Sequence, residues 1–308
     1  MITASVKSYA KLNLTLDIKG AKNGFHELDS LVCNVNICDT LFFKKRRDPL
    51  VNVYMRGRGS ENIPPEQNNA VKAGEAFVSA FNTTGADITI WKDIPLSGGL
   101  GGSSADIAGV LRGMAKLYGL TQEKERLKEI ADSLGSDAGY MLTGGFARLR
   151  GRGEIVQPLP CVDELHFLLI QPPTGVSAKE CFLAFDRENA SYPPVTEQAA
   201  FALIGERREE FFSLLKNDLQ NAACSLSGEV KQAVAEGKDF SPLACSMTGS
   251  GSYVFVLFEN EEFCRWAKSR YKGKFLTRIV KSVVPNKKRE SKSLYSLTEE
   301  ERNLLNGE

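Results

Sequence analysis

The chain has 308 residues, of which 42% are hydrophobic and 25% are charged, so it is long enough to bury a core in one or two domains. Its 39 basic and 38 acidic side chains leave a net charge of +1, which provides no overall field that would attract nucleic acid or a membrane surface. No apolar N-terminal segment and no run of bilayer length is visible, so these features favour a cytoplasmic protein that binds a small molecule.

The side chains that most often bind metals are sparse in this sequence. Seven cysteines form no CxxC pair and are expected to be reduced thiols, and the two histidines, His26 and His166, lie far apart. Because a zinc site needs several His or Cys ligands at short spacing, the sequence predicts none. Any catalytic chemistry must therefore come from other residue types.

The first regular pattern is an alternation of apolar and polar side chains over residues 11–18, which predicts a half-buried strand. Lys11 and Asn13 fall beside each other on its polar face. A solvated strand face is the alternative interpretation of this pair, and the pattern alone leaves both open.

A turn at residues 22–24 leads to a second predicted strand over residues 25–43. Residues 44–66 contain the basic runs KKRR and RGRG and indicate a strand pair with exposed, solvated loops. Asn68 or Asn69 is then expected to cap a helix with apolar residues at the 3.6-residue period.

A short apolar strand and a helix enclose the stretch PLSGGLGGSSAD at residues 95–106, in which four of five consecutive residues are glycine. Glycine permits positive φ and close approach of a ligand, and the N-terminus of a helix attracts anions, so the stretch predicts a phosphate site. It is not a Walker A loop, because no lysine follows the last glycine, and Ser104 breaks the dinucleotide-binding pattern. The alternative is a glycine-rich turn whose serines cap the helix.

Two helices are predicted after this stretch. The first covers residues 107–118, and Thr121 is expected to cap the second, which Gly135 ends. Asp137 follows directly, where an aspartate is usually a turn or cap residue, so its position alone leaves a catalytic role open.

The second half of the chain predicts a β, α, β, α, β order, which indicates a small sheet with helices on one face. A hairpin over residues 144–160 precedes it, and its prolines 158 and 160 indicate a domain boundary. Strands are expected near residues 164–173, 254–258 and 275–284, and helices at residues 179–185, 197–226 (one or two), 229–236 and 261–271. Thr298 and Glu301 form a capping box for a short terminal helix.

Three segments in this order, AKLNLTLDI, PLSGGLGGSSAD and MTGSGSYVFVLF, resemble the signature of the GHMP kinase superfamily. In closer detail, AKLNLTLDIKGAKNGFHELDSL, GSDAGYMLTGGFARLRGRGE and GVSAKECFLAFD resemble the branch of that family whose substrate is a cytidine diphosphate-linked methylerythritol. The resemblance extends to about residue 285 and implies an α+β fold of two domains. Residues 1–157 would form a domain like ribosomal protein S5 domain 2, residues 158–285 a ferredoxin-like domain, and residues 286–308 a tail with a short helix.

The resemblance also implies roles for particular residues. Asp137 matches the catalytic aspartate of the family, Lys11 matches the lysine beside it, and Ser104 would help to hold Mg²⁺. The implied ATP-binding residues are Asn68, Lys92, Pro95, Gly98, Gly99, Leu100, Gly101, Gly102, Ser103 and Ser104. The implied substrate-binding residues are Asn13, Phe25, His26, Phe182, Phe185, Thr248, Gly249, Ser250 and Gly251, of which the last four would close over the phosphate region.

The function implied is the ATP-dependent phosphorylation of the 2-hydroxyl group of that substrate, in the non-mevalonate synthesis of isoprenoid precursors, by a monomer or homodimer. Another GHMP kinase of the homoserine or mevalonate type, or a non-catalytic nucleotide- or metabolite-binding relative, remains an alternative. The sequence departs from the family at Gly139, where proline is common, and at Ser97 and Ser103, where glycine is common.

Overall fold

The computed structural model describes residues 3–22, 24–57, 68–96, 98–160, 164–188 and 191–283. The chain divides into two compact units, each made of several segments. The first unit comprises Met1–Ala10, Ile37–Leu96 and Gly101–Thr143, and the second comprises Lys11–Asn36, Ser97–Leu100 and Gly144–Glu308. The predicted domain boundary after residue 157 stays a prediction, and the predicted tail helix with its capping box lies outside the described residues.

The first unit is built on strands β4 (Asn52–Gly57), β5 (Ala86–Lys92) and the first-unit part of β3 (Phe25–Lys45). Strand β5 lies between the other two, parallel to β4 and antiparallel to β3. Strand β1 (Thr3–Asn13) pairs with β3, and both run through the two units. The helices of this unit are α1 (Asn69–Phe81), α2 (Gly102–Tyr118), α3 (Lys124–Leu134) and α4 (Ala138–Thr143).

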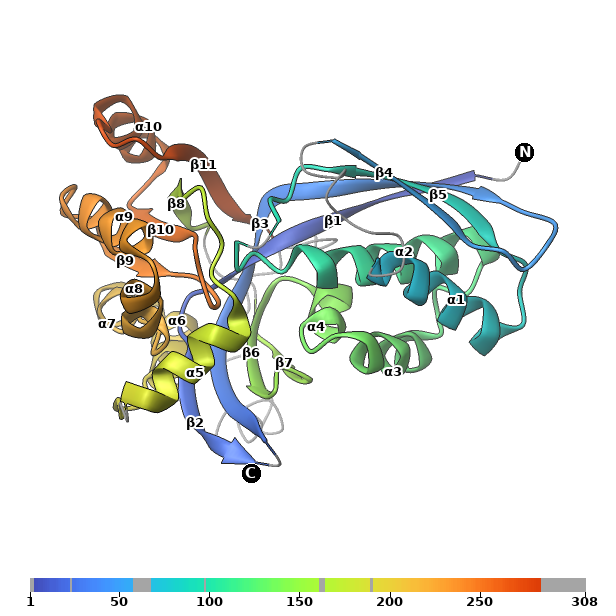
Figure 1. Cartoon of the computed structure of the whole chain (residues 1–308), viewed down its shortest axis with the longest axis horizontal. Helices are drawn as coiled ribbons and strands as arrows, with labels where there is room; N and C mark the ends of the chain where they lie inside the picture. The colour runs from blue at the N-terminus through green and yellow to red at the C-terminus, as the bar shows by residue number, and fades with distance from the viewer. Residues whose placement is uncertain are drawn as a thin grey trace. The chain divides into compact units, whose positions relative to one another are not determined.

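The core of the first unit follows from the two periodicities of its elements. Alternate residues of β5 and β3, such as Ile88, Ile90 and Leu41, are buried against the apolar stripes of α1 and α2. Figure 1 shows α1 and α2 along one side of β4 and β5. Among the described residues, no helix of this unit lies on the other side of these strands.

The predicted ends of the helices are only partly correct. Asn68 caps α1, since its side chain accepts a hydrogen bond of 3.0 Å from the amide of Ala70, and α3 ends at Gly135 as expected. Thr121 is not a cap, because α3 begins three residues later and follows Glu123. Helix α4 was not predicted, because six residues are too few to show helical periodicity.

The second unit contains a four-stranded antiparallel sheet made of β8 (His166–Gln171), β9 (Ala244–Met247), β10 (Val254–Phe258) and β11 (Leu276–Val283). The strands lie in the order β11, β8, β10, β9. Helices α5 (Ala178–Glu188), α6 (Thr196–Ile204), α7 (Arg208–Ser213), α8 (Gln220–Leu226) and α9 (Gly228–Lys238) connect β8 to β9. Helix α10 (Glu261–Arg270) connects β10 to β11, so the order is the βαββαβ of a ferredoxin-like fold.

Two differences from the predicted second half are informative. The sequence did not predict β9, which is four residues long and pairs with β10 across the small-residue turn at residues 248–252. The region 197–226, expected to hold one or two helices, holds α6, α7 and α8. The predicted hairpin is confirmed by β6 (Phe146–Gly151) and β7 (Ile155–Pro158), which pair antiparallel.

The strand predicted over residues 11–18 is interrupted. Strand β1 ends at Asn13, and β2 (Asp17–Lys22) begins after a break and pairs with β3. Both faces of the segment are buried, since Lys11 is 5% exposed and Thr15 is fully buried. The solvated strand face considered as an alternative is therefore wrong, and the polar side chains must find partners inside the protein.

Candidate active site

The glycine loop is held against the β9–β10 turn within the second unit. Gly99 has a φ of +76°, and a Cβ there would lie 2.3 Å from the carbonyl oxygen of Thr248. A Cβ at Gly98 would lie 2.4 Å from the ring of Tyr253. The carbonyl of Leu100 accepts a hydrogen bond of 3.0 Å from the amide of Lys11. Only glycine at position 99 permits the backbone of the loop to come this close to the backbone at Thr248.

The turn that supports the loop is itself fixed by hydrogen bonds. The amide of Gly251 donates to the carbonyl of Thr248 at 3.1 Å. The side chain of Asn217 donates to the carbonyls of Met247 and Gly249 at 2.9 and 2.8 Å. Sequence reasoning missed Asn217, because an asparagine after a helix shows no sign of a partner thirty residues later.

Lys11 and Asn13 belong to the same cluster. The ammonium of Lys11 donates to the side-chain oxygen of Asn13, and both residues are 5% exposed. The amide of Asn13 donates to the hydroxyl of Thr248 at 2.8 Å, and its side-chain nitrogen donates to the hydroxyl of Ser30 at 2.7 Å. The second unit therefore brings together a buried cation, the turn at residues 248–251 and glycines 98 and 99.

The continuation of the glycine loop begins helix α2 in the first unit. Gly101 is its N-cap with a φ of +72°, and no side chain caps the helix, so the alternative in which a serine caps it is wrong. The first-turn amides thus lack the side-chain acceptor that a cap would provide, and they form the kind of helix N-terminus that attracts anions. Ser103 is exposed and accepts a bond of 2.9 Å from Asn69, while Ser104 is half-buried.

Lys92 lies in the interior, and its expected contact with a nucleotide stays a prediction. Its ammonium lies 2.5 Å from Asp39 and 2.6 Å from Asp106, and its side chain is 1% exposed. Burial lowers the pKa of Lys92, but the charges of Asp106 and Asp39 raise it by more. The net pKa is therefore raised, and the lysine stays protonated. The cluster joins the strand before the glycine loop to the helix after it. Sequence reasoning missed the two aspartates. Each is a charged residue within an apolar segment, and this pattern could have indicated that they are buried and paired.

Asp39 and Asp106 share this one cation unequally. Asp39 also accepts hydrogen bonds from the amides of Asp93 and Ile94 at 2.7 and 2.9 Å. One oxygen of Asp106 is buried without a partner among the described residues. Burial therefore raises the pKa of Asp106 from 3.8 to about 7, against the opposing effect of Lys92.

This pKa predicts a pH dependence of stability. A carboxyl whose pKa is raised by folding contributes stability that is complete below pH 3.8 and is lost as the pH rises to about 7. We expect the free energy of unfolding in urea to fall from about pH 5 to about pH 8, and to fall less in Asp106→Asn, which cannot ionise. The exposed acid Glu75, changed to glutamine, is the control and should keep the wild-type slope. Equal slopes in wild type and Asp106→Asn would contradict this assignment.

Asp137 directly precedes helix α4 and is half-buried. Its carbonyl accepts a hydrogen bond of 3.0 Å from the amide of Met141, which fixes the start of the helix. A Cβ at Gly139, in the first turn, would lie 2.1 Å from a carboxylate oxygen of Asp132 in α3, so a larger residue there would displace that side chain.

Some of the expected substrate-binding residues are aromatic, and the structure brings part of these together. The ring of His26 stacks on Phe182 at 4.7 Å between centroids and meets Phe185 edge-on at 6.4 Å. Its Nε2 lies 2.7 Å from a carboxylate oxygen of Asp186, a partner that sequence reasoning missed. Phe25 is 53% exposed and lies under the guanidinium of Arg152 at 4.1 Å. Of the remaining predicted residues, Asn68 is buried as a helix cap, and Pro95 and Ser250 are half-buried.

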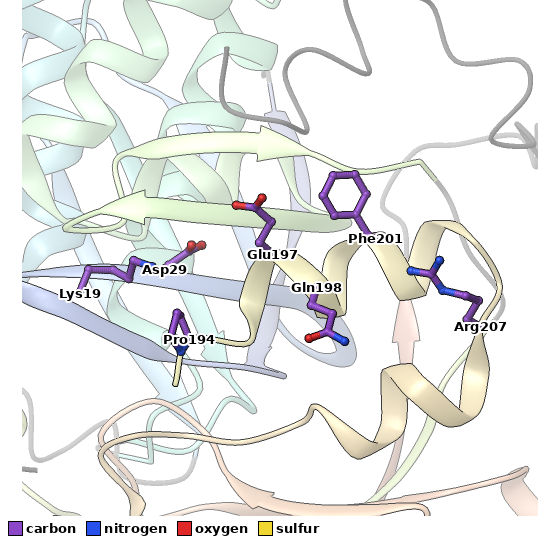
Figure 2. Close-up of a pocket in the computed structure, with 7 residues that line it drawn as sticks. All are labelled: Lys19, Asp29, Pro194, Glu197, Gln198, Phe201 and Arg207. Carbon is purple, nitrogen blue, oxygen red and sulfur yellow. The ribbon is translucent and has the colours of Figure 1, made fainter. Parts of the chain in front are cut away.

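A separate cavity of about 510 Å³ opens in the second unit (Figure 2). Its lining residues are Lys19, Asp29, Pro194, Glu197, Gln198, Phe201 and Arg207. None of these is a predicted site residue. Arg148 donates to both oxygens of Asp29 and to one oxygen of Glu197, each at 2.8 Å, so both carboxylates are already paired. The cavity therefore gives no indication of its own ligand.

No described helix is long and apolar enough to cross a membrane. No group of three or more His, Cys, Asp or Glu side chains in the described residues is arranged to hold a metal ion.

Comparison with known proteins agrees with this architecture. The pattern of the GHMP kinases N terminal domain matches residues 68–147, and that of the GHMP kinases C terminal matches residues 199–263. The chain belongs to the GHMP kinases, whose members transfer phosphate from ATP to small-molecule alcohols.

Within this family the chain is similar to particular enzymes. It is 37% identical to the 4-diphosphocytidyl-2-C-methyl-D-erythritol kinase of Carboxydothermus hydrogenoformans, over 82% of this chain and 87% of that one. The kinase of the same name from Desulfitobacterium hafniense is 36% identical, over 83% and 87%. A crystal structure of 4-(cytidine 5'-diphospho)-2C-methyl-D-erythritol kinase matches with a TM-score of 0.75 and 25% identity, over 91% and 99%. A homoserine kinase from Cytophaga hutchinsonii shares the fold, with a TM-score of 0.72 and 19% identity, over 92% and 95%.

Proposed function

We propose that this protein is an ATP-dependent kinase that phosphorylates the 2-hydroxyl group of 4-diphosphocytidyl-2-C-methyl-D-erythritol. The observation that carries the substrate assignment is the cluster of His26, Phe182, Phe185 and Asp186. The carboxylate and the two aromatic rings would hold His26 in place, so that the ring of Phe25 could stack on a pyrimidine and backbone groups near His26 could bind its edge. The identity of 36% and 37% to kinases named for this substrate supports the same assignment.

The glycine loop and the start of α2 would bind the phosphates of ATP. Positive φ at Gly99 and Gly101 turns the backbone, and the first-turn amides of α2 would donate to phosphate oxygens. Phosphoryl transfer needs mainly positioning and neutralised charge, which such donors supply. Mg²⁺ would be held by Ser104 together with phosphate oxygens and water, since it prefers oxygen ligands. The ion would neutralise charge on the phosphates.

Asp137 would accept the proton of the substrate hydroxyl, and Lys11 would offset negative charge that develops during transfer. The hydrogen bond from Lys11 to the side chain of Asn13 would orient the ammonium group. Asn13 itself would lie on the substrate side. Phe25, half-exposed, would present a ring face to the pyrimidine.

The test is a substrate comparison with purified protein, ATP and Mg²⁺. We expect release of ADP that depends on 4-diphosphocytidyl-2-C-methyl-D-erythritol, with a kcat/KM at least about 100-fold above that for homoserine or mevalonate. Faster turnover of homoserine or mevalonate would replace the substrate but keep the reaction class. No turnover of any alcohol, with intact nucleotide binding, would favour a non-catalytic relative.

The close approach of Gly99 to Thr248 predicts a specific sensitivity of ATP binding. Gly99→Ala should raise the KM for ATP about tenfold or more, because its Cβ would displace the loop from the Thr248 carbonyl 2.3 Å away. Gly119 is a matched control, since it has a φ of +71° and open space where a Cβ would lie. Gly119→Ala carries the same backbone strain of about 1–2 kcal/mol and should leave the KM unchanged. A similar KM in the two variants would show that the loop contact does not matter.

A further inference from the structure

Asn13 is held from three directions within the second unit. Its backbone amide donates to the hydroxyl of Thr248 at 2.8 Å, and its side-chain oxygen accepts a hydrogen bond from the ammonium of Lys11. Its side-chain nitrogen donates to the hydroxyl of Ser30 at 2.7 Å. Asn13 is 5% exposed and Ser30 is 2% exposed, so water is not at hand to replace these partners. Ser30 has no role in the family resemblance or in the proposed function.

Ser30 accepts a hydrogen bond from Asn13 because its own proton is used elsewhere. A serine hydroxyl carries one hydrogen, and Ser30 donates it to the carbonyl oxygen of Thr15 at 2.5 Å. Towards Asn13, the oxygen of Ser30 can therefore only accept. On the other side of Asn13, the ammonium of Lys11 can only donate. The side-chain amide has one orientation that satisfies both neighbours, with its nitrogen towards Ser30 and its oxygen towards Lys11.

The acceptor of the Ser30 proton is fixed by the break between β1 and β2, in which Thr15 lies. The hydroxyl of Thr15 accepts a hydrogen bond of 2.9 Å from the amide of Leu31. It donates to the hydroxyl of Thr196 at 2.7 Å, because Thr196 uses its own proton on a backbone carbonyl of β3. These bonds hold Thr15 in place, so its carbonyl oxygen stays directed at Ser30.

The side-chain amide of Asn13 in turn holds the ammonium of Lys11. The two residues lie on the same face of β1, and Lys11 is 5% exposed, so its ammonium has little access to water. We propose that Ser30 is a positioning residue, which orients the amide of Asn13 so that its oxygen keeps Lys11 in place for phosphoryl transfer. This inference rests on the proposed function, in which Lys11 offsets developing negative charge. Displacement of such a cation lowers the rate, because preorganised charge acts only at the right distance.

Steady-state kinetics of Ser30→Ala test this role. The change removes the acceptor of the buried side-chain nitrogen of Asn13, so the amide turns and no longer holds Lys11. We expect kcat to fall about tenfold and the KM for ATP to stay within about twofold of the wild type. Ser30→Thr keeps the hydroxyl and should restore most of kcat. Ser30→Cys fills the same space with a weaker acceptor, so its kcat should fall as well.

The matched control is Ser282→Ala on β11. Ser282 is also buried, at 5% exposure, and its hydroxyl also accepts a hydrogen bond, from the amide of Leu165 at 2.9 Å. Loss of this bond should lower the midpoint of urea unfolding by an amount similar to that for Ser30→Ala. It should leave kcat unchanged, because Leu165 has no role in the proposed reaction.

A double-mutant cycle separates positioning from a general loss of structure. If Ser30 acts through Asn13, then Ser30→Ala should lower kcat in the wild type but not in Asn13→Ala, where the amide is already absent. Additive losses in the double variant, or wild-type kcat in Ser30→Ala and Ser30→Cys, would overturn the proposal while the kinase assignment stands. A wild type that phosphorylates no alcohol would instead reject the proposed function, and the role of Ser30 with it.

Discussion

Replacement of Asp137 by asparagine should lower kcat about 10³-fold and leave the affinity for ATP unchanged, if the proposed function is correct. The amide has the size of the carboxyl but cannot accept the proton of the substrate hydroxyl. Asp137 lies at the start of α4, where asparagine is as well tolerated as aspartate, so the free energy of unfolding should change by less than about 1 kcal/mol. Steady-state kinetics, nucleotide titration and urea unfolding measure the three quantities.

The matched control for this variant is Asp132→Asn in α3, whose carboxylate packs against Gly139. It removes a carboxylate of similar burial that is paired with Lys128, so it should leave kcat within about threefold of the wild type. If Asp137→Asn keeps wild-type turnover, another group must act as the base, and the role implied by the family resemblance would be rejected.

Replacement of Lys92 by methionine should lower the free energy of unfolding by about 3–5 kcal/mol. The change removes the cation that lies between Asp39 and Asp106 and leaves these two buried carboxylates without it. Methionine has a similar length, so the loss of packing is small and the loss of charge dominates. Urea unfolding near neutral pH measures the effect.

Two further variants separate the charge from the shape. Lys72→Met, at an exposed position of α1, should change stability by less than about 0.5 kcal/mol. The double variant Lys92→Met, Asp106→Asn should recover part of the loss, since it removes one of the two buried charges. A double variant that is less stable than Lys92→Met by the full cost of Asp106→Asn would show that the two side chains do not interact.

Features that depend on neighbours in the sequence were predicted well. The cap at Asn68, the end of α3 at Gly135 and the hairpin over residues 144–160 each rest on residues within a few positions. The prediction that Thr121 caps α3 was wrong for a local reason as well, because the helix begins three residues later, at Lys124. The pattern of strands and helices in the second half was sufficient to indicate its small sheet.

Side-chain partners that are distant in sequence were not predictable. His26 and Asp186 are 160 positions apart, and Asn13 and Thr248 are 235 apart. No periodicity or spacing links such residues, because folding alone brings them together. The roles of Lys11 and Asp137 came from resemblance to a family rather than from the pattern around them, and they stay predictions.

The glycine loop has a consequence for the order in which the protein is made. Gly98 and Gly99 owe their positions to Tyr253 and Thr248, which are synthesised much later. Because chains emerge from the ribosome N-terminus first, these contacts of the loop cannot form until residues 248–253 have been made. A nascent chain that stops before the β9–β10 turn therefore lacks the neighbours that fix the conformation of the loop.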